Sequence, residues 1–199
     1  MNEYRTHNCG ELRKENIGQT VKIAGWVQSV RNLGGLVFVD VRDQYGITQA
    51  VTSGESELVE EVSNILTEST ISVEGKVRPR GEGAINNDMP TGEIEIEIEK
   101  IEILGKRLKN LPFEINSDIE AREDLRLQYR FLDLRNEKLK ENILLRSKIL
   151  QFLRTQMIER GFTEVQTPIL TSSSPEGARD YLVPSRVHPG KFYALPQAP

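Results

Sequence analysis

The first half of the chain alternates apolar and polar residues over short stretches, a pattern typical of β-strands with one buried face. Four such stretches cover residues 21–27, 36–41, 47–51 and 71–77. In a fifth, residues 94–103, isoleucines alternate with glutamates until the phase slips at Glu99-Lys100, which indicates a β-bulge. Between the third and fourth stretches, residues 55–68 have apolar side chains at helical spacing, with Ser56 as the expected N-cap.

Five strands with a helix between the third and fourth have the element order of an OB-fold, a small all-β barrel that binds oligonucleotides. A charged, irregular segment follows, and then an apolar stripe that predicts a helix from Asn136 to Arg160, ended by Gly161. The next ten residues, 161–170, are expected to form a strand interrupted by Pro168, which must lie at an edge, a kink or an interface. We therefore expect a barrel over residues 1–105, a hinge over 106–135 and a further domain over 136–199.

Composition narrows the class of protein. Of the 199 residues, 37% are hydrophobic and 28% charged, as in ordinary soluble globular proteins. No apolar run is long enough for a membrane span, and no secretory signal is visible, so a cytoplasmic protein is expected. Cys9 is the only cysteine, which excludes an internal disulfide and a zinc site built from several thiolates. The net charge of -4 gives no general attraction to DNA or RNA, so an RNA partner would need a local patch.

Phe38 is a candidate for RNA contact because it occupies the unusual face of its strand. Alternation assigns Val37, Val39 and Val41 to the core face and Phe38 to the outer face, next to Asp40. An outward ring on an OB barrel either stacks on an unpaired base, which is worth roughly 1–3 kcal/mol, or packs against another part of the protein. The strand pattern alone leaves both interpretations open.

Gln49 and several arginines are weaker candidates. An amide suits readout of splayed-out bases, but Gln49 shares a strand face with Ile47 and Val51. If that face is the core, Gln49 is buried or lies at a bulge. Three arginines flank the expected binding face and either meet phosphates or are solvated surface charges: Arg31, Arg78 and Arg80.

Carboxylates in two other places have different interpretations. The alternating run of residues 94–103 is best explained as a strand with isoleucines inward and glutamates in water, so no metal site is predicted there. Glu176 lies in a loop of small residues, 172–178, and a loop carboxylate can either bind an ammonium group or remain solvated. His7 and His188 are isolated, and no Walker-type loop, GxGxxG fingerprint or GxSxG elbow is present.

Two longer stretches resemble a known family. Residues 161–186, GFTEVQTPILTSSSPEGARDYLVPSR, resemble the first signature motif of class II aminoacyl-tRNA synthetases and the amino-acid-binding loop beyond it. Within this stretch, the segment PEGARDYLVPSR is similar to the corresponding segment of the bacterial-type aspartyl-tRNA synthetase family. Residues 25–51 resemble the anticodon-binding OB domain of the same family. The resemblance implies a multidomain chain: an all-β OB-fold barrel followed by the start of an α+β class II catalytic domain, an antiparallel sheet with helices.

The resemblance also implies roles for individual residues. Arg31, Phe38 and Gln49 stand where the family contacts anticodon bases, and Arg78 is grouped with them on the tRNA-binding face. Glu176 matches the glutamate that binds the α-amino group of L-aspartate. Pro168 matches the motif proline at the dimer interface. The chain departs from the family at Asn32, where an acidic residue is common, and at Ala198, where a serine is common.

The implied activity is an aspartate–tRNA ligase that uses ATP with Mg²⁺ to form aspartyl-adenylate and then charges tRNA, as a cytoplasmic homodimer. Motifs 2 and 3 would lie beyond Pro199, so this chain contains no catalytic residue and no metal ligand and is expected to be inactive alone. It would supply contacts to the anticodon stem-loop, a dimer contact and part of the L-aspartate pocket. Two alternatives stay open: a class II synthetase for asparagine or lysine, and a non-catalytic tRNA-binding fragment.

Overall fold

The computed structural model describes residues 3–117, 121–173 and 180–195. The chain divides into two compact units, Met1–Leu111 and Pro112–Pro199, and each is considered by itself. The boundary between them lies within the residues expected to form the hinge. No helix in the described ranges is long and apolar enough to cross a membrane.

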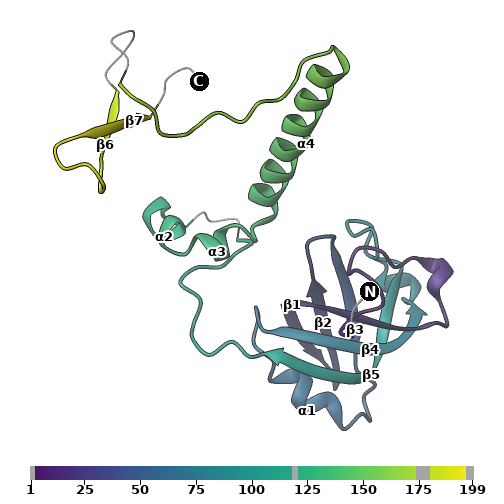
Figure 1. Ribbon diagram of the computed structural model, residues 1–199. Helices are drawn as coiled ribbons and strands as arrows, with labels where there is room; N and C mark the ends of the chain where they lie inside the picture. Colours follow the sequence, from purple (N-terminus) through teal and green to yellow (C-terminus); the bar gives the residue numbers. More distant parts are fainter. Residues whose placement is uncertain (1–2, 118–120, 174–179, 196–199) are drawn as a thin grey trace. The chain divides into compact units, whose positions relative to one another are not determined.

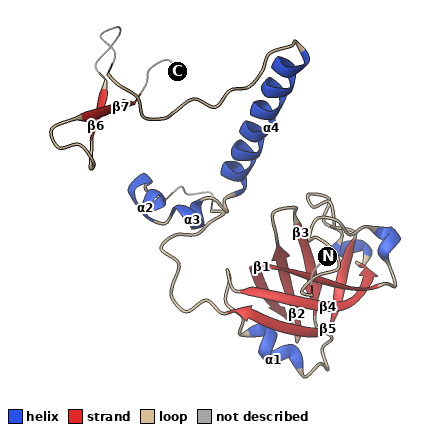
Figure 2. Ribbon diagram, in the orientation of Figure 1, coloured by secondary structure: helices blue, strands red, loops and turns tan. Residues whose placement is uncertain are grey.

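The first unit is a closed five-stranded barrel (Figures 1 and 2). Its strands are β1 (Thr20–Leu33), β2 (Leu36–Arg42), β3 (Ile47–Val51), β4 (Thr70–Pro79) and β5 (Ile94–Gly105). They follow the order β1-β2-β3-β5-β4, and β4 closes the barrel by pairing with β1. All neighbours are antiparallel except β3 and β5, which run parallel. The predicted OB-fold barrel is confirmed.

Strand alternation fills the barrel as expected. Val37, Val39 and Val41 are fully buried in β2 and pack in the core with Ile94 and Ile96 of β5. Branched side chains dominate this core, which suits the pleated inner surface of a strand. The consequence for function is that the alternate residues of β2, including Phe38, must face outward.

A β-bulge lies where the isoleucine–glutamate phase slips. Glu74 of β4 pairs with Lys100, whereas the next residue, Gly75, pairs with Ile98, so Glu99 is the extra residue of β5. This confirms the predicted bulge at Glu99-Lys100. A bulge increases local twist and bends its strand, which helps β5 follow the barrel wall.

The helix of the first unit is shorter than its apolar periodicity predicts. α1 covers only Leu58–Ser63, and its N-cap position is Glu57, not Ser56. Ser56 instead accepts a hydrogen bond from the Leu58 backbone N at 3.2 Å. The helix ends early because the chain must turn to rejoin β1, where the Glu68 backbone N donates to the Val27 carbonyl at 2.7 Å.

An N-terminal segment that the strand pattern did not reveal packs on the barrel. Cys9 and Leu12 are fully buried in the core, ahead of the 3-10 turn η1 (Lys14–Asn16). The Cys9 backbone N donates to Asp43 at 3.0 Å, which fixes the segment to the turn between β2 and β3. Burial, with the nearby Asp43 carboxylate as a further cause, raises the pKa of the Cys9 thiol, so this cysteine stays protonated and unreactive.

The second unit begins with two short helices inside the segment expected to be an irregular hinge. These are α2 (Glu123–Gln128) and α3 (Arg130–Asp133). Asp133 is buried and accepts from Arg130 at 2.6 Å, with Arg126 a further 3.8 Å ion-pair partner. A buried carboxylate between two guanidinium groups therefore organises this turn. The segment is highly charged and has no apolar periodicity, so its sequence pattern did not predict the two helices.

The long helix α4 (Glu137–Glu159) confirms the prediction made from its apolar stripe. Asn136 caps it, since its side chain accepts from the Leu139 backbone N at 3.2 Å. Gly161 ends it with a φ of 86°, the left-handed conformation that glycine adopts without steric cost.

The predicted strand over residues 161–170 is wrong. Residues 162–168 have no regular secondary structure, and only Thr171 forms an isolated bridge, to Ala194. A strand needs a hydrogen-bonded neighbour, and the described part of the chain provides none for this segment. The hairpin beyond it pairs β6 (Tyr181–Pro184) with β7 (Phe192–Leu195) in antiparallel register.

Gly75 tests how closely the backbones of β4 and β5 approach each other. A Cβ at this position would collide with the Glu97 carbonyl of β5, whereas a Cβ at Gly83, in the short turn η2 (Glu82–Ala84), meets nothing within 4 Å. We expect Gly75→Ala to lower the free energy of unfolding by about 2–3 kcal/mol, because the bulged strand must move. Urea denaturation measures this, with Gly83→Ala as the matched control. Equal stability of the two variants would contradict the packing.

Candidate nucleic-acid interface

The outer face of the barrel at β1, β2 and β3 brings three of the predicted RNA contacts together. Register places Arg31 of β1 opposite Phe38 of β2, and Asp40 of β2 opposite Gln49 of β3. Phe38 is half-buried on the side opposite the core valines. The three side chains on adjacent strands therefore form one continuous surface.

This surface is the wall of a pocket of about 330 Å³. The polar loop between β4 and β5 closes its other side. The lining residues are Arg31, Leu33, Phe38, Asp40, Gln49, Arg80, Ala84, Asn86 and Met89. The volume lies within the range of small-ligand sites, and an aromatic ring with an amide and guanidinium groups suits a nucleobase. We call this cavity the Phe38 pocket.

The Gln49 side chain is buried, yet its strand face is not the core. Ala50 is the β3 residue that packs in the core, and Gln49 faces the opposite way. Its burial comes from polar neighbours: Arg31 donates to Gln49 Oε1 at 3.1 Å, and Gln49 Nε2 donates to Glu95 at 2.9 Å. The two bonds fix which end of the amide faces which neighbour, so the group is oriented before any ligand arrives.

Glu95 and Asp40 hold the arginines of this surface in place. Asp40 accepts from Arg31 at 3.0 Å and from the Ser29 hydroxyl at 2.6 Å. Glu95 accepts from Arg78 Nε at 2.9 Å while it also binds Gln49. Arg78 also reaches Glu97 at 3.5 Å, and its side chain stays 36% exposed. Arg78 contacts the Gln49 partner Glu95 but does not line the Phe38 pocket.

Glu95 corrects the expectation that the glutamates of residues 94–103 lie in water. It is only 7% exposed, although it alternates with the inward-facing Ile94 and Ile96 as predicted. The reason is that β3 lies beside β5 and covers this position with Gln49. The parallel β3–β5 pairing expected of an OB-fold is the signal that could have identified Glu95.

Arg80 is a further candidate binding residue, and its burial beside the Phe38 pocket supports that role more strongly than its position in the sequence. It is 8% exposed, and its Nε donates to the Ile94 carbonyl at 3.0 Å. Its Nη2 is buried with no hydrogen-bond partner among the described residues. Burial lowers the pKa of the Arg80 guanidinium, and the Glu95 and Asp40 carboxylates oppose that shift. A buried donor without a partner beside a pocket indicates a ligand acceptor, such as a base carbonyl or a phosphate.

The two remaining predicted site residues lie in the second unit. Glu176 falls outside the described residues. Pro168 is exposed, in a stretch without regular structure. Among the described residues, no group of three or more histidine, cysteine, aspartate or glutamate side chains could hold a metal ion.

Comparisons with known proteins match each unit to a described family. Residues 21–104 match the family described as OB-fold nucleic acid binding domain, and residues 122–199 match tRNA synthetases class II (D, K and N). The chain therefore belongs to the class II aminoacyl-tRNA synthetases.

Within that class the chain is similar to aspartate–tRNA ligases along its whole length. Aspartate–tRNA(Asp/Asn) ligase of Rhodopseudomonas palustris is 53% identical over 199 residues, which are 100% of this chain and 34% of the relative. Aspartate–tRNA ligase of Streptomyces coelicolor is 51% identical with the same coverage. The chain thus spans about a third of the length of these curated relatives and corresponds to the N-terminal portion of an aspartyl-tRNA synthetase of the bacterial type.

A solved structure has the same arrangement of elements. Asparaginyl-tRNA synthetase from Pyrococcus horikoshii, complexed with asparaginyl-adenylate, is 28% identical with a TM-score of 0.81. The match covers 96% of this chain and 42% of that chain. The predicted fold class, an OB barrel followed by the start of a class II catalytic domain, is confirmed.

Glu95 is the residue on which the arrangement of the Phe38 pocket can be tested. Glu95→Ala removes an acceptor of both Gln49 and Arg78, and leaves the buried Gln49 amide without the partner of its donor. We expect the free energy of unfolding to fall by about 2 kcal/mol, as measured by urea denaturation. Glu99→Ala, an exposed glutamate of the same strand, is the control and should change it by less than about 0.5 kcal/mol. A Glu95→Ala protein as stable as this control would contradict the described network.

Proposed function

We propose that the chain is the anticodon-binding and dimer-forming part of an enzyme that joins L-aspartate to tRNA. The whole enzyme activates L-aspartate with ATP, giving aspartyl-adenylate and pyrophosphate, and then transfers aspartate to the tRNA. The names of the relatives and the class II match support this activity. The same family membership supports a cytoplasmic location.

The observation that carries the RNA-binding part of the proposal is the Phe38 pocket. An unpaired base stacks on the Phe38 ring while the oriented Gln49 amide meets its polar edge. Arg31 and the unpartnered Nη2 of Arg80 meet base carbonyls or backbone phosphates. The anticodon stem-loop of tRNA offers such unpaired bases. The net negative chain binds it through this local patch and not through its overall charge.

The long helix supports assembly with a second copy. Exposed apolar side chains cover several sides of α4, among them Ile143, Leu144, Leu145, Ile149, Leu150, Phe152 and Leu153. A single helix cannot keep so much apolar surface in water, so other protein covers it. The resemblance of residues 161–186 to the first class II motif implies that part of the α4 surface, together with Pro168, forms a homodimer contact. The remaining part of the catalytic sheet covers the rest of the α4 surface.

Substrate binding is shared between this chain and residues outside it. Glu176 binds the α-ammonium group of L-aspartate, as its motif implies. Mg²⁺ enters with ATP, as the class II match implies. Magnesium, when bound, neutralises charge on the phosphates of ATP.

An asparagine-specific enzyme is the second candidate, favoured by the structural match to an asparaginyl-tRNA synthetase. The relatives of 51–53% identity carry the aspartate name, which favours L-aspartate. One of them is named for both aspartate and asparagine tRNAs. Whether this enzyme charges both tRNAs depends on contacts near the Asn32 turn.

Phe38→Ala tests the RNA-binding proposal. Loss of one stacking contact costs roughly 1–3 kcal/mol, so affinity for an anticodon stem-loop RNA should fall about 5- to 150-fold in a fluorescence-anisotropy titration. Tyr45→Ala is the matched control, since Tyr45 is an exposed ring of the same unit outside the Phe38 pocket. Unchanged affinity of Phe38→Ala, or an equal loss in both variants, would remove the stacking proposal.

A second test asks whether the 199-residue chain can activate L-aspartate by itself. We expect the 199-residue chain to give only background aspartate-dependent exchange of pyrophosphate into ATP, because the motifs that bind ATP lie outside it. A full-length aspartate–tRNA ligase serves as the positive control. Robust exchange by the shorter chain would overturn this part of the proposal without affecting RNA binding.

A further inference from the structure

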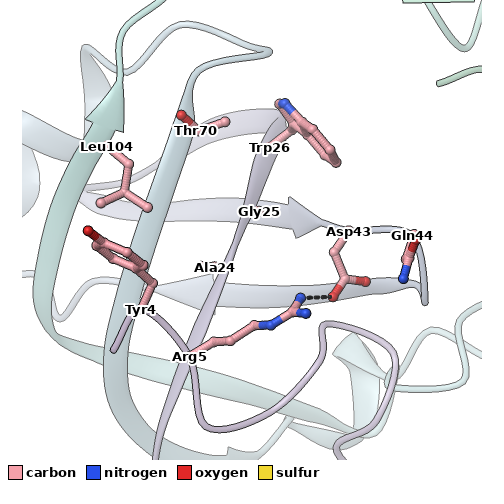
Figure 3. A pocket seen from close by; sticks show the side chains of 9 residues that line it. All are labelled: Tyr4, Arg5, Ala24, Gly25, Trp26, Asp43, Gln44, Thr70 and Leu104. Carbon is pink, nitrogen blue, oxygen red and sulfur yellow. Dashed lines mark hydrogen bonds and ion pairs between the residues drawn. The ribbon is translucent and has the colours of Figure 1, made fainter. Parts of the chain in front are cut away.

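A second cavity of about 430 Å³ lies on the first unit, and neither the motifs nor the family resemblance gives it a role. Figure 3 shows the side chains that line it: Tyr4, Arg5, Ala24, Gly25, Trp26, Asp43, Gln44, Thr70 and Leu104. We call it the Trp26 pocket. Its volume lies in the range that holds a small organic ligand.

The Trp26 pocket is separate from the Phe38 pocket. Trp26 pairs with Arg42 of β2, whereas Arg31 pairs with Phe38, so the two aromatic rings belong to opposite ends of the β1–β2 ribbon. Phe38 and Arg42 are four positions apart in β2, a distance of about 13 Å at the usual rise of a strand. The two pockets have no lining residue in common.

The walls of the Trp26 pocket suit a flat aromatic ring. Tyr4 and Leu104 lie on one side and Trp26 on the other, and the β1 strand passes between them at Ala24 and Gly25 (Figure 3). Because Ala24 has a small side chain, a planar ring can lie against the strand at this point, whereas the position of a Gly25 Cβ faces the Arg42 carbonyl of β2. Aromatic walls bind such rings by stacking.

The wall containing Tyr4 is already in place without a ligand. The Ser72 hydroxyl donates to the Tyr4 carbonyl at 2.8 Å, and Lys22 Nζ donates to the Glu3 carbonyl at 2.9 Å. The Thr6 backbone N donates to the Lys22 carbonyl at 2.7 Å on the other side of Tyr4. A preformed wall lowers the entropy cost of binding.

Polar groups gather at one side of the Trp26 pocket. Arg5 donates to Asp43 at 3.4 Å, and that buried carboxylate also accepts backbone N–H groups of Cys9 and Tyr45. Asp43 is therefore occupied with structure, while the exposed Gln44 amide beside it offers a donor and an acceptor. A donor and an acceptor next to an aromatic slot match the hydrogen-bonding edge of a nucleobase better than a purely apolar ring.

We propose that the Trp26 pocket is a second nucleobase-binding site of the barrel, in which the ring stacks between Tyr4 and Trp26 and its polar edge meets Gln44. The base comes either from a free nucleoside or from an unpaired nucleotide of a bound RNA. The proposal does not depend on the enzyme's activity or on the Phe38 pocket.

The chain contains a built-in probe for this test, because Trp26 is its only tryptophan. The indole N–H resonance of Trp26 in a proton–nitrogen NMR spectrum therefore reports on this pocket alone. We expect adenosine to shift this resonance saturably in the 199-residue chain. Gln44→Ala should weaken the apparent affinity about fivefold, the effect of one hydrogen bond, and Tyr4→Leu about tenfold through lost stacking.

Controls separate the two pockets and the two sources of the base. Phe38→Ala should leave the adenosine response of Trp26 unchanged. A short oligoadenylate tests the RNA source, so a response to it and not to adenosine assigns RNA, and the reverse assigns a free nucleoside. Benzyl alcohol, an aromatic ring without a base edge, should bind more weakly and be insensitive to Gln44→Ala.

Four results would overturn the proposal. They are no shift with either adenosine or oligoadenylate, equal affinity in the parent and both pocket variants, loss of the shift in Phe38→Ala, or benzyl alcohol binding as tightly as adenosine. The indole resonance of each variant without ligand shows whether the barrel is still folded. Gln44 is exposed in a turn, so its substitution keeps the test valid if Tyr4→Leu disturbs the fold.

Discussion

Parallel pairing of β3 with β5 joins two strands far apart in the sequence, and the proposed RNA-binding surface depends on this pairing. The pairing joins only two residue pairs, Ala50 with Ile96 and Val51 with Glu97. It nevertheless brings Glu95 against Gln49, two residues separated by 46 positions in sequence. Through Glu95 it also places Arg78, and through the Ile94 carbonyl it places Arg80. Without this pairing the Gln49 amide would lack its bond to Glu95, and Arg78 and Arg80 would not be positioned beside it.

Buried polar groups order the side chains of this surface and leave one hydrogen-bond donor available to a ligand. Arg31 donates to both Asp40 and Gln49, and Gln49 donates to Glu95, so these side chains are held in place without a ligand. Arg80 is different, because its Nη2 remains buried without a partner among the described residues. Burial of an unpaired donor is costly in the free protein. In the proposed function an acceptor supplied by RNA removes that cost, which connects the stability of the unit to its proposed binding.

The second unit illustrates what local sequence can and cannot specify. Asn136, Gly161 and the apolar periodicity determine where α4 starts and ends, because capping and helix propensity are local. The same signals do not say what covers the helix, and the apolar side chains of α4 stay exposed. Residues 162–168 have strand-like composition but no strand neighbour, so they remain irregular. The strand prediction failed because pairing is a non-local interaction.

Residue patterns alone were enough to predict the order of barrel elements, the inward valines, the outward Phe38, the bulge at Glu99 and the family of the chain. Each of these depends on alternation, spacing or motif, which are properties of neighbouring residues. Three features became visible only in the folded barrel: Gln49 is buried on the outer face, Glu95 is buried and not in water, and Trp26 borders a second cavity. These depend on which strands and segments meet across the barrel, and such contacts join residues far apart in the chain.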